Sequence, residues 1–330
     1  MNVYVIYTGG TVGMKRVDGV YKPVAGHLAE QVGRLEHPDL PDFDLNEYTP
    51  LLDSANMRPA NWQVIAEDIA EHYDTYDGFV VLHGTDTMAY TAAALSFALE
   101  GLGKPVILTG SQIPLAEVRS DARENLITSL LLAAHSEVPE VCLYLNGHLL
   151  RGNRATKVSS SGFSAFTSPN FPPLGSVGVE IEVNRRLLRP PGDALTVQTL
   201  GVAQVVALRL FPGITAEILD NVLQKPVQGL VLETYGAGNA PSNDAALLGV
   251  LRASTARGVV VVNCTQCLHG SVDMSDYATG SVLREAGVVG GFDMTPEAAL
   301  TKLIYLLSKG LSSEKVKQQV QRDLRGELTN

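Results

Sequence analysis

The stretch "VYVIYTGGT", residues 3–11, combines two signals that together indicate the fold. A continuous apolar run predicts a buried strand, and the two glycines between Thr8 and Thr11 predict a tight turn that brings the backbone close to a ligand. Two ligands fit such a turn. One is a phosphate held by backbone amides, and the other is a substrate presented to a threonine hydroxyl.

Composition places the chain among globular proteins. Its 330 residues are 45% hydrophobic, with a mean hydropathy of +0.10, and this length favours two domains. The net charge of −10 disfavours nucleic acid and an anionic membrane surface as partners. The N-terminus lacks the pattern of a signal peptide, so we expect a cytoplasmic protein.

The three cysteines form no disulfide framework. Cys264 and Cys267 have C-x-x-C spacing, with His269 nearby, but a second pair of zinc ligands is missing from the pattern. We interpret the cysteines as reduced structural thiols and expect neither a metal nor a cofactor.

Short apolar runs alternate with helical patterns along the chain, which predicts an α/β fold. The predicted strands cover residues 3–8, 79–82, 106–108, 141–145, 177–183, 205–208, 230–232 and 259–262. The predicted helices cover 87–99 and 117–134 and begin near 215, 243, 295 and 312, with Ser242 as a cap.

The organisation predicted from this alternation has two domains. Residues 1–184 form a larger N-terminal catalytic domain, a parallel sheet with helices on both faces. Residues 185–203, with their prolines and charges, form a linker, and residues 204–330 form a smaller C-terminal α/β domain. The long polar stretch 152–173 inside the first domain is typical of a functional loop.

Glycine and polar residues follow four of the predicted strands, in "TGGT", "HGTDT", "TGSQ" and "NGH". Because ligands of an open parallel sheet bind at the carboxyl ends of its strands, we expect these residues to share one site. A phosphate site is disfavoured, since neither G-x-x-x-x-G-K-[ST] nor a helix-opening G-x-G-x-x-G occurs.

Hydroxyl chemistry is the remaining alternative, and it needs a neighbouring base. No G-x-S-x-G motif is present, so a Ser-His-Asp hydrolase is not indicated. The candidate bases are Lys157, in the polar stretch, and Tyr21. An isolated lysine is more often a solvated surface charge, so the pattern alone leaves this choice open.

The motifs resemble those of the bacterial-type L-asparaginases. "YTGGTVGM" (7–14) and "DGFVVLHGTDTMAYTAAALSF" (77–97) are similar to the two signature segments of that family. The segments "DSANM" (53–57), "GSQIPL" (110–115), "SDARENL" (120–126), "RATKVSS" (154–160) and "YGAGNAP" (235–241) match it in order. Without a signal peptide, the chain resembles the cytoplasmic type I branch.

The resemblance implies hydrolysis of L-asparagine to L-aspartate and ammonia, through an acyl-enzyme and without metal or cofactor. Thr11 matches the nucleophile and Tyr21 the tyrosine of its lid, and Thr85, Asp86 and Lys157 match a second, triad-like set. The family also implies a homodimer or homotetramer.

Asp53, Ser54, Thr85 and Asp86 match the residues that bind the substrate's α-amino and α-carboxylate groups. A free amino acid carries a cation and an anion on one carbon, so carboxylates beside fixed donors suit it. Taken alone, Ser54 would be a turn residue and Asp86 a cap of the helix near Thr87.

Three functions remain open from the sequence. The first is an asparaginase. The second is a broader amidase that accepts glutamine or acts within a tRNA-dependent amidotransferase, and the third is a non-catalytic amino-acid-binding protein. The loop from Met14 to Tyr21 should be mobile and close over substrate. Thr8 and His83 are interpreted as structural, and Asn239 as a turn residue.

Overall fold

The computed structural model describes residues 1–330 except 34, 36, 202, 275–277 and 330. The chain divides into two compact units, Met1–Val197 and Gln198–Asn330. The division falls within residues 185–203, the range predicted to be a linker. Both units combine a sheet with helices, so the prediction of two α/β domains is confirmed.

The first unit contains an eight-stranded sheet in the order β13-β12-β9-β8-β7-β5-β1-β4. Its strands are β1 (Asn2–Gly9), β4 (Asp42–Leu52), β5 (Gly78–Leu82), β7 (Val106–Thr109), β8 (Val141–Leu145), β9 (His148–Arg151), β12 (Gly175–Val177) and β13 (Ile181–Val183). The strands from β4 to β8 run parallel, and β9, β12 and β13 continue the sheet antiparallel. The sheet is therefore mixed, with a parallel part where the strand-end motifs lie.

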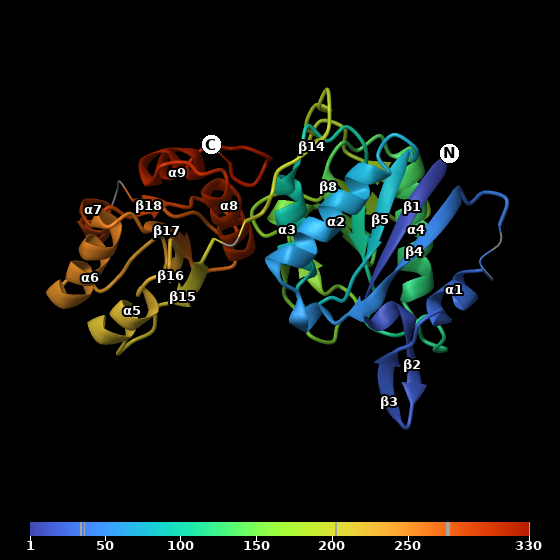
Figure 1. The fold of residues 1–330 in the computed structure, drawn as a ribbon, viewed down its shortest axis with the longest axis horizontal. Helices are drawn as coiled ribbons and strands as arrows, with labels where there is room; N and C mark the ends of the chain where they lie inside the picture. Colours follow the sequence, from blue (N-terminus) through green and yellow to red (C-terminus); the bar gives the residue numbers. More distant parts are fainter. Residues whose placement is uncertain (34, 36, 202, 275–277, 330) are drawn as a thin grey trace. The chain divides into compact units, whose positions relative to one another are not determined.

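Helices cover both faces of this sheet, as predicted. They are α1 (His27–Val32), α2 (Pro59–Glu71), α3 (Met88–Ala98) and α4 (Ala122–His135). In Figure 1, α2 and α3 lie on one side of the sheet and α4 on the other. Every residue of β5 and β8 is buried, because a strand covered on both faces meets no water on either side.

Helix α4 begins at Ala122, five residues later than the predicted start at Glu117. The carboxylate of Asp121 accepts hydrogen bonds from the backbone N–H groups of Gln112 and Ile113, at 3.0 and 2.9 Å. These bonds hold the residues before α4 in turns, an arrangement that helical periodicity does not reveal.

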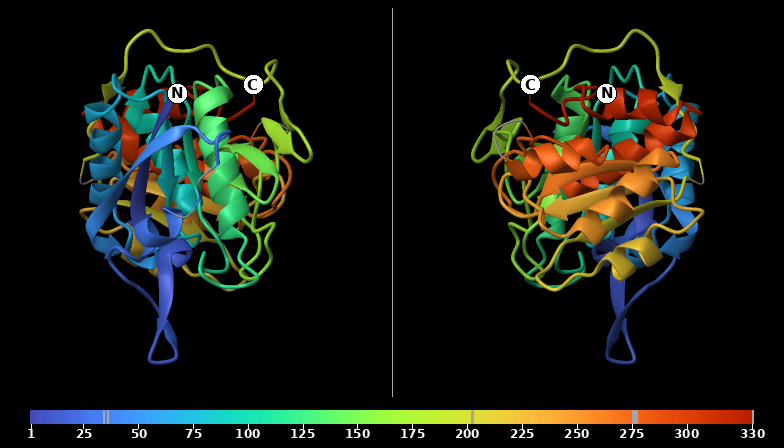
Figure 2. Two further views of the ribbon diagram at one scale, coloured as in Figure 1. Left: turned by 90° about the vertical axis from the view of Figure 1, so that its right-hand side faces the viewer. Right: turned by 90° about the vertical axis from the view of Figure 1, so that its left-hand side faces the viewer.

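Three short ladders complete the first unit. Strands β2 (Met14–Val17) and β3 (Val20–Pro23) form a hairpin, β6 (Leu99–Glu100) pairs with β14 (Thr196–Val197), and β10 (Thr156–Lys157) pairs with β11 (Phe166–Thr167). Three 3₁₀ turns, η1 (Thr11–Gly13), η2 (Ser54–Asn56) and η3 (Gly152–Arg154), follow β1, β4 and β9. Figure 2 shows the β2–β3 hairpin projecting from the first unit, clear of its large sheet.

The second unit has a four-stranded parallel sheet, β15-β16-β17-β18, made of Val205–Arg209, Gly229–Thr234, Val260–Thr265 and Val289–Gly290. Its helices are α5 (Ala216–Val222), α6 (Ala245–Ala256), α7 (Ala278–Glu285), α8 (Pro296–Ser308) and α9 (Ser313–Val320). The cap predicted at Ser242 is wrong. Helix α6 is capped by Asp244, whose Oδ1 accepts from the Leu247 N–H at 2.9 Å.

Candidate active site

The polar residues after β1, β5, β7 and β8 lie at one edge of the sheet. These four strands are parallel neighbours, so their carboxyl ends share one edge. Thr11 follows β1 and Thr85 follows β5, while Gly110–Gln112 and Asn146–His148 follow β7 and β8. The motifs therefore lie along one edge of the sheet, as predicted.

Glycine contacts bring two of these segments, those after β1 and β5, into direct contact with each other and with the turn after β4. A Cβ on Gly10, which has φ +93°, would lie 2.5 Å from Gly84 Cα, and a Cβ on Gly84 would lie 2.4 Å from Ser54 Oγ. Neither position tolerates a side chain. These contacts hold the turns that carry Thr11, Ser54 and Thr85 against one another.

A hydrogen-bonded triad joins Thr85 and Asp86, which follow β5, to Lys157 of β10. Lys157 Nζ donates to Thr85 Oγ1 at 2.9 Å and to Asp86 Oδ1 at 2.8 Å. Thr85 is buried, the Lys157 side chain is 20% exposed, and the Asp86 side chain is 64% exposed. Lys157 is therefore not a solvated surface charge, because it is held between a buried hydroxyl and a carboxylate at the edge of the sheet.

Asp86 does not cap the following helix, which corrects the simplest reading of its position. The N-cap of α3 is Thr87, and no side chain caps that end. Thr87 Oγ1 donates instead to the carbonyl of Ser54 at 2.7 Å. The Asp86 carboxylate pairs with Lys157 because the chain places it toward β10 and not toward the first turn of α3.

Asp53 and Ser54 lie at the end of β4, beside these residues. Ser54 is buried, whereas Asp53 is exposed, with its Oδ1 accepting from the Ala55 N–H at 3.0 Å. This bond caps the short η2 turn. The Ser54 hydroxyl lies against Gly84, the residue before Thr85.

Tyr21 lies on the β2–β3 hairpin. Its side chain is 37% exposed, its hydroxyl accepts from Arg16 Nη2 at 3.2 Å, and the Arg16 guanidinium carbon lies 4.8 Å from its ring centre. The segment predicted to be a mobile loop contains a β-hairpin. Its exposed strands make few contacts with the rest of the first unit.

Two nearby polar residues are structural, as predicted. Thr8 is buried, and its hydroxyl donates to the carbonyl of Leu82 at 3.0 Å. His83 is fully buried, with Nδ1 2.6 Å from the Gly84 carbonyl oxygen and Nε2 2.9 Å from Thr91 Oγ1. Burial lowers the pKa of His83 to about 4, so the ring is neutral and serves as a hydrogen-bonding strut.

The segment that carries Lys157 is fixed by residues that the sequence did not single out. Gln112 Nε2 donates to the Gly162 carbonyl at 2.9 Å, and Asn146 Nδ2 lies 2.6 Å from Ser164 Oγ. Gln112 occurs in the quoted motif "GSQIPL", directly after a predicted strand. That position was the only signal of its role.

A second anchor uses aromatic stacking. The guanidinium carbons of Arg151 and Arg154 lie 4.4 and 5.1 Å from the ring centre of Phe171. Both arginines are buried, and Arg151 also forms a two-pronged ion pair with Glu140. Phe171, near the end of the polar segment, is thereby tied to its beginning.

The cysteines, and the residue types that could ligate a metal, indicate no further chemistry. Cys264 is buried, which raises the pKa of its thiol to about 12, and Cys267 is exposed with a free thiol. Across the described part of the chain, no group of three or more His, Cys, Asp or Glu side chains could hold a metal ion. No helix there is long and apolar enough to cross a membrane.

Comparison with known proteins agrees with this geometry. The family model "Asparaginase, N-terminal" matches residues 2–189, and "Glutaminase/Asparaginase C-terminal domain" matches residues 204–320. L-asparaginase 1 of Escherichia coli (strain K12) is 53% identical over 335 residues, covering 99% of this chain and 98% of that protein.

Two solved structures share the whole fold. L-asparaginase I of Vibrio cholerae superimposes with a TM-score of 0.93 at 50% identity, covering 100% of this chain and 99% of the other. The thermostable L-asparaginase of Thermococcus kodakarensis gives 0.92 at 36% identity, covering 100% of both chains.

Fold, site and relatives together define an amidohydrolase, an enzyme class that cleaves carboxamides with water. Within that class, the chain belongs to the asparaginase family.

Proposed function

We propose that this chain is an L-asparaginase that converts L-asparagine and water to L-aspartate and ammonia. One observation supports this above all. A lysine is hydrogen-bonded to a buried threonine at the carboxyl edge of the sheet, where the glycine turn before Thr11 packs against Gly84. A binding protein would need neither the second threonine nor its basic partner.

In this proposal, Asp53, Ser54 and Asp86 bind the amino-acid part of the substrate. The two carboxylates attract the α-ammonium group, while the Ser54 hydroxyl and nearby backbone N–H groups donate to the α-carboxylate. The substrate's carboxamide then extends toward Thr11 and Thr85. A free amino acid is thereby held at both of its charges.

The reaction proceeds through two acyl transfers. Thr11 Oγ1 forms a bond to the carboxamide carbon, the C–N bond breaks, and the threonine proton leaves with the nitrogen as ammonia. Water then attacks the ester, its hydroxyl joins the acyl carbon, and its proton returns to Thr11. Thr85 and Lys157 relay protons, with neutral Lys157 as base, and Tyr21 approaches Thr11 when the hairpin closes.

The setting of the enzyme follows from the same proposal. We place it in the cytoplasm, acting on a small molecule without metal or cofactor, as a homodimer or homotetramer. The relatives named L-asparaginase 1 and L-asparaginase I support the activity, while the compartment and the oligomer are inferred from the family resemblance.

The test is ammonia release by the purified protein from L-asparagine and, separately, from L-glutamine. We expect asparagine to be preferred. Equal kcat/KM values would instead favour a glutaminase-asparaginase, an activity that the description of the second family model also names.

Thr11→Val should abolish most turnover while leaving the fold intact, because it removes one hydroxyl and little volume. Thr8→Val is the matched control: it makes the same change two glycines away, at a hydroxyl bonded to the Leu82 carbonyl. A Thr11→Val enzyme with near wild-type kcat would contradict the nucleophile assignment.

A further inference from the structure

Asn125 is a polar residue on the buried side of α4, near the start of the helix, and it is 1% exposed. Its side-chain Nδ2 donates to the Gly110 carbonyl at 3.0 Å and to Asp121 Oδ2 at 3.2 Å. Its Oδ1 accepts from the Asn146 N–H at 3.1 Å. Gly110 follows β7 and Asn146 follows β8. One side-chain amide therefore joins the carboxyl ends of two neighbouring strands.

An amide suits this position better than other side chains of its size. The Asn146 N–H needs an acceptor, whereas the Gly110 carbonyl and the Asp121 carboxylate need a donor. A carboxylate at residue 125 would face a second carboxylate and a carbonyl oxygen. A leucine there would take the partner away from two backbone groups in the interior.

Asp121 extends these contacts to the residues that follow β7. Its carboxylate accepts from the backbone N–H groups of Gln112 and Ile113 as well as from Asn125. Three N–H donors therefore surround one negative charge, and hydrogen bonds to a charged acceptor are stronger than those between neutral groups. The Asp121–Asn125 pair thus fixes the turn in which Gln112 lies.

Two paths of hydrogen bonds lead from this pair to the segment that carries Lys157. On the first path, Gln112 Nε2 donates to the Gly162 carbonyl at 2.9 Å. On the second, Asn146 Nδ2 lies 2.6 Å from Ser164 Oγ. Gly162 and Ser164 belong to the loop between β10 and β11, and Lys157 belongs to β10. The loop is therefore held at two points by residues that the pair fixes.

The ladder between β10 and β11 transmits the position of this loop to the base. Lys157 pairs with Phe166 across the ladder, and the Val158 N–H donates to the Ala165 carbonyl at 2.8 Å. Because the two strands are bonded to each other, a shift of residues 162–164 also shifts Lys157. The distance of 2.9 Å between Lys157 Nζ and Thr85 Oγ1 then changes.

We propose that Asp121 and Asn125 are positioning residues for the reaction, which hold Lys157 at hydrogen-bonding distance from Thr85. This role rests on the proposed function, in which Lys157 is the base. A displacement of about 1 Å is enough to slow proton transfer strongly. The substrate-binding residues follow β4 and β5, whereas the pair holds the segments after β7 and β8. The pair should therefore affect kcat much more than KM.

The first test is Asn125→Asp, which keeps the size of the side chain and replaces the donor toward Gly110 and Asp121 by an oxygen. We expect kcat to fall at least about tenfold, with KM within about twofold of wild type. Circular dichroism checks that the variant is folded. An Asn125→Asp enzyme that is folded and has wild-type kcat would overturn the proposal.

A second variant cuts both paths outside the core, where folding is not at risk. Gln112 is half-buried and Ser164 is exposed. Gln112→Met removes the donor to the Gly162 carbonyl, and Ser164→Ala removes the partner of Asn146. The combined variant should lower kcat about as much as Asn125→Asp does, again with little change in KM. Wild-type kcat in the combined variant would contradict the two paths.

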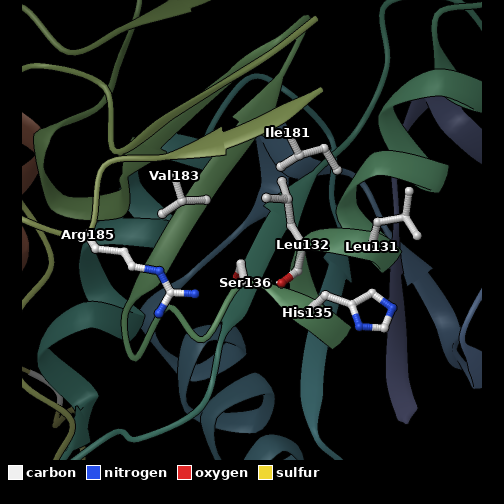
Figure 3. A pocket seen from close by; sticks show the side chains of 7 residues that line it. All are labelled: Leu131, Leu132, His135, Ser136, Ile181, Val183 and Arg185. Carbon is white, nitrogen blue, oxygen red and sulfur yellow. Dashed lines mark hydrogen bonds between the residues drawn. The ribbon is translucent and has the colours of Figure 1, made fainter. Parts of the chain in front are cut away.

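Ser136→Ala is the control for a disturbance of α4 itself. Ser136 is buried just past the other end of the helix, and its hydroxyl donates to the Leu132 carbonyl at 2.5 Å. Figure 3 shows Ser136 and Leu132 with Ile181 and Val183 of β13 around a hollow of about 420 Å³. This end of α4 thus packs beside β13, the last strand at that edge of the described sheet. The control should keep wild-type kcat.

A double variant separates positioning of the base from a general loss of structure. If the pair acts through Lys157, then Asn125→Asp added to Lys157→Met should lower kcat by less than about twofold, because the base that it positions is already absent. Two effects that multiply in the double variant would overturn the proposal. A Lys157→Met single variant with full activity would instead contradict the proposed function, and the positioning role would fall with it.

Discussion

Two polar segments adjoin the edge of the sheet where the site lies, and the structure holds them very differently. The β2–β3 hairpin follows the short turn that begins at Thr11. Its side chains are largely exposed, and among the described residues Tyr21 is bound by Arg16 of the same hairpin. The segment 152–173, which carries Lys157, is fixed by Gln112 and by Phe171.

This difference indicates what each segment contributes. Proton transfer needs heavy atoms within about 3 Å, so the base must be held in place before substrate arrives. A lid must instead let substrate in, and a weakly held hairpin can move at low cost. Both segments are polar stretches in the sequence, and their tertiary contacts distinguish the fixed segment from the movable one.

Within these two segments, removing the base should have the largest effect. We expect Lys157→Met to lower kcat by about 10³-fold while largely preserving the binding of asparagine, because Asp53 and Ser54 remain. Lys157→Arg should not restore activity, since a guanidinium retains its proton in this pH range. The measurement is kcat and KM for both variants. An active arginine variant would show that only positive charge is needed at this position.

The second expected effect concerns the stability of the fold and comes from the buried histidine His83. The pKa of His83 is lowered from 6.5 to about 4, so the unfolded state binds a proton at a higher pH than the folded state does. The contribution of His83 to stability is therefore complete above about pH 6.5 and is lost as the pH falls toward 4. It should amount to roughly 3 kcal/mol.

Urea unfolding between pH 7.5 and 4.5 measures this loss. His83→Gln offers an amide in place of the ring and has no proton to gain, so its free energy of unfolding should fall less steeply with acid. Parallel curves for wild type and variant would show that His83 does not cause the acid sensitivity.

Removing the aromatic ring of Phe171 should lower kcat less than removing Lys157, the base that this ring helps to position. Phe171→Leu keeps an apolar side chain but removes the ring beneath Arg151 and Arg154. We expect kcat to fall about tenfold with KM nearly unchanged, because Lys157 loses its fixed position and the substrate-binding residues do not. Phe171→Tyr retains the aromatic face and should recover most of the activity. A leucine variant with unchanged kcat would mean that the segment 152–173 is held without the stacking of the two arginines on an aromatic ring.

The strands that position the site could be predicted because they are buried on both faces. The predicted boundaries of β5, β7 and β8 agree with the structure within one residue, since strands covered by helices consist of continuous apolar runs. The 11-residue edge strand β4 was missed. Its Asn46 and Tyr48 bind Asp68 of α2, so polar residues that indicate a loop are used there in tertiary hydrogen bonds.

The site was predictable only in part for a related reason. Thr11 and Thr85 follow apolar runs. The glycines beside them indicate that the backbone comes close to a ligand there. Lys157 is separated from Thr85 by 72 positions, and nothing local to it indicates a partner. Its selection depended on resemblance to a family. Gln112 lies in a segment that matched the family, but no role was assigned to it, and Phe171 had no such support. The anchoring function of both residues exists only in the folded arrangement.

The smallest effect should come from the hairpin contact, and it tests whether this segment is free to move. Arg16 binds Tyr21 through one hydrogen bond and one stacking contact, both exposed to water, where such pairs contribute little. Arg16→Met should therefore change kcat by no more than about twofold, and it should lower KM slightly if Arg16 holds Tyr21 away from the substrate. Lys15→Met is the matched control, because it removes an equal charge one position earlier on the same strand, where the side chain is also exposed. If Arg16→Met instead reduced kcat as strongly as Phe171→Leu, the hairpin would need a fixed geometry too, and the contrast between the two segments would disappear.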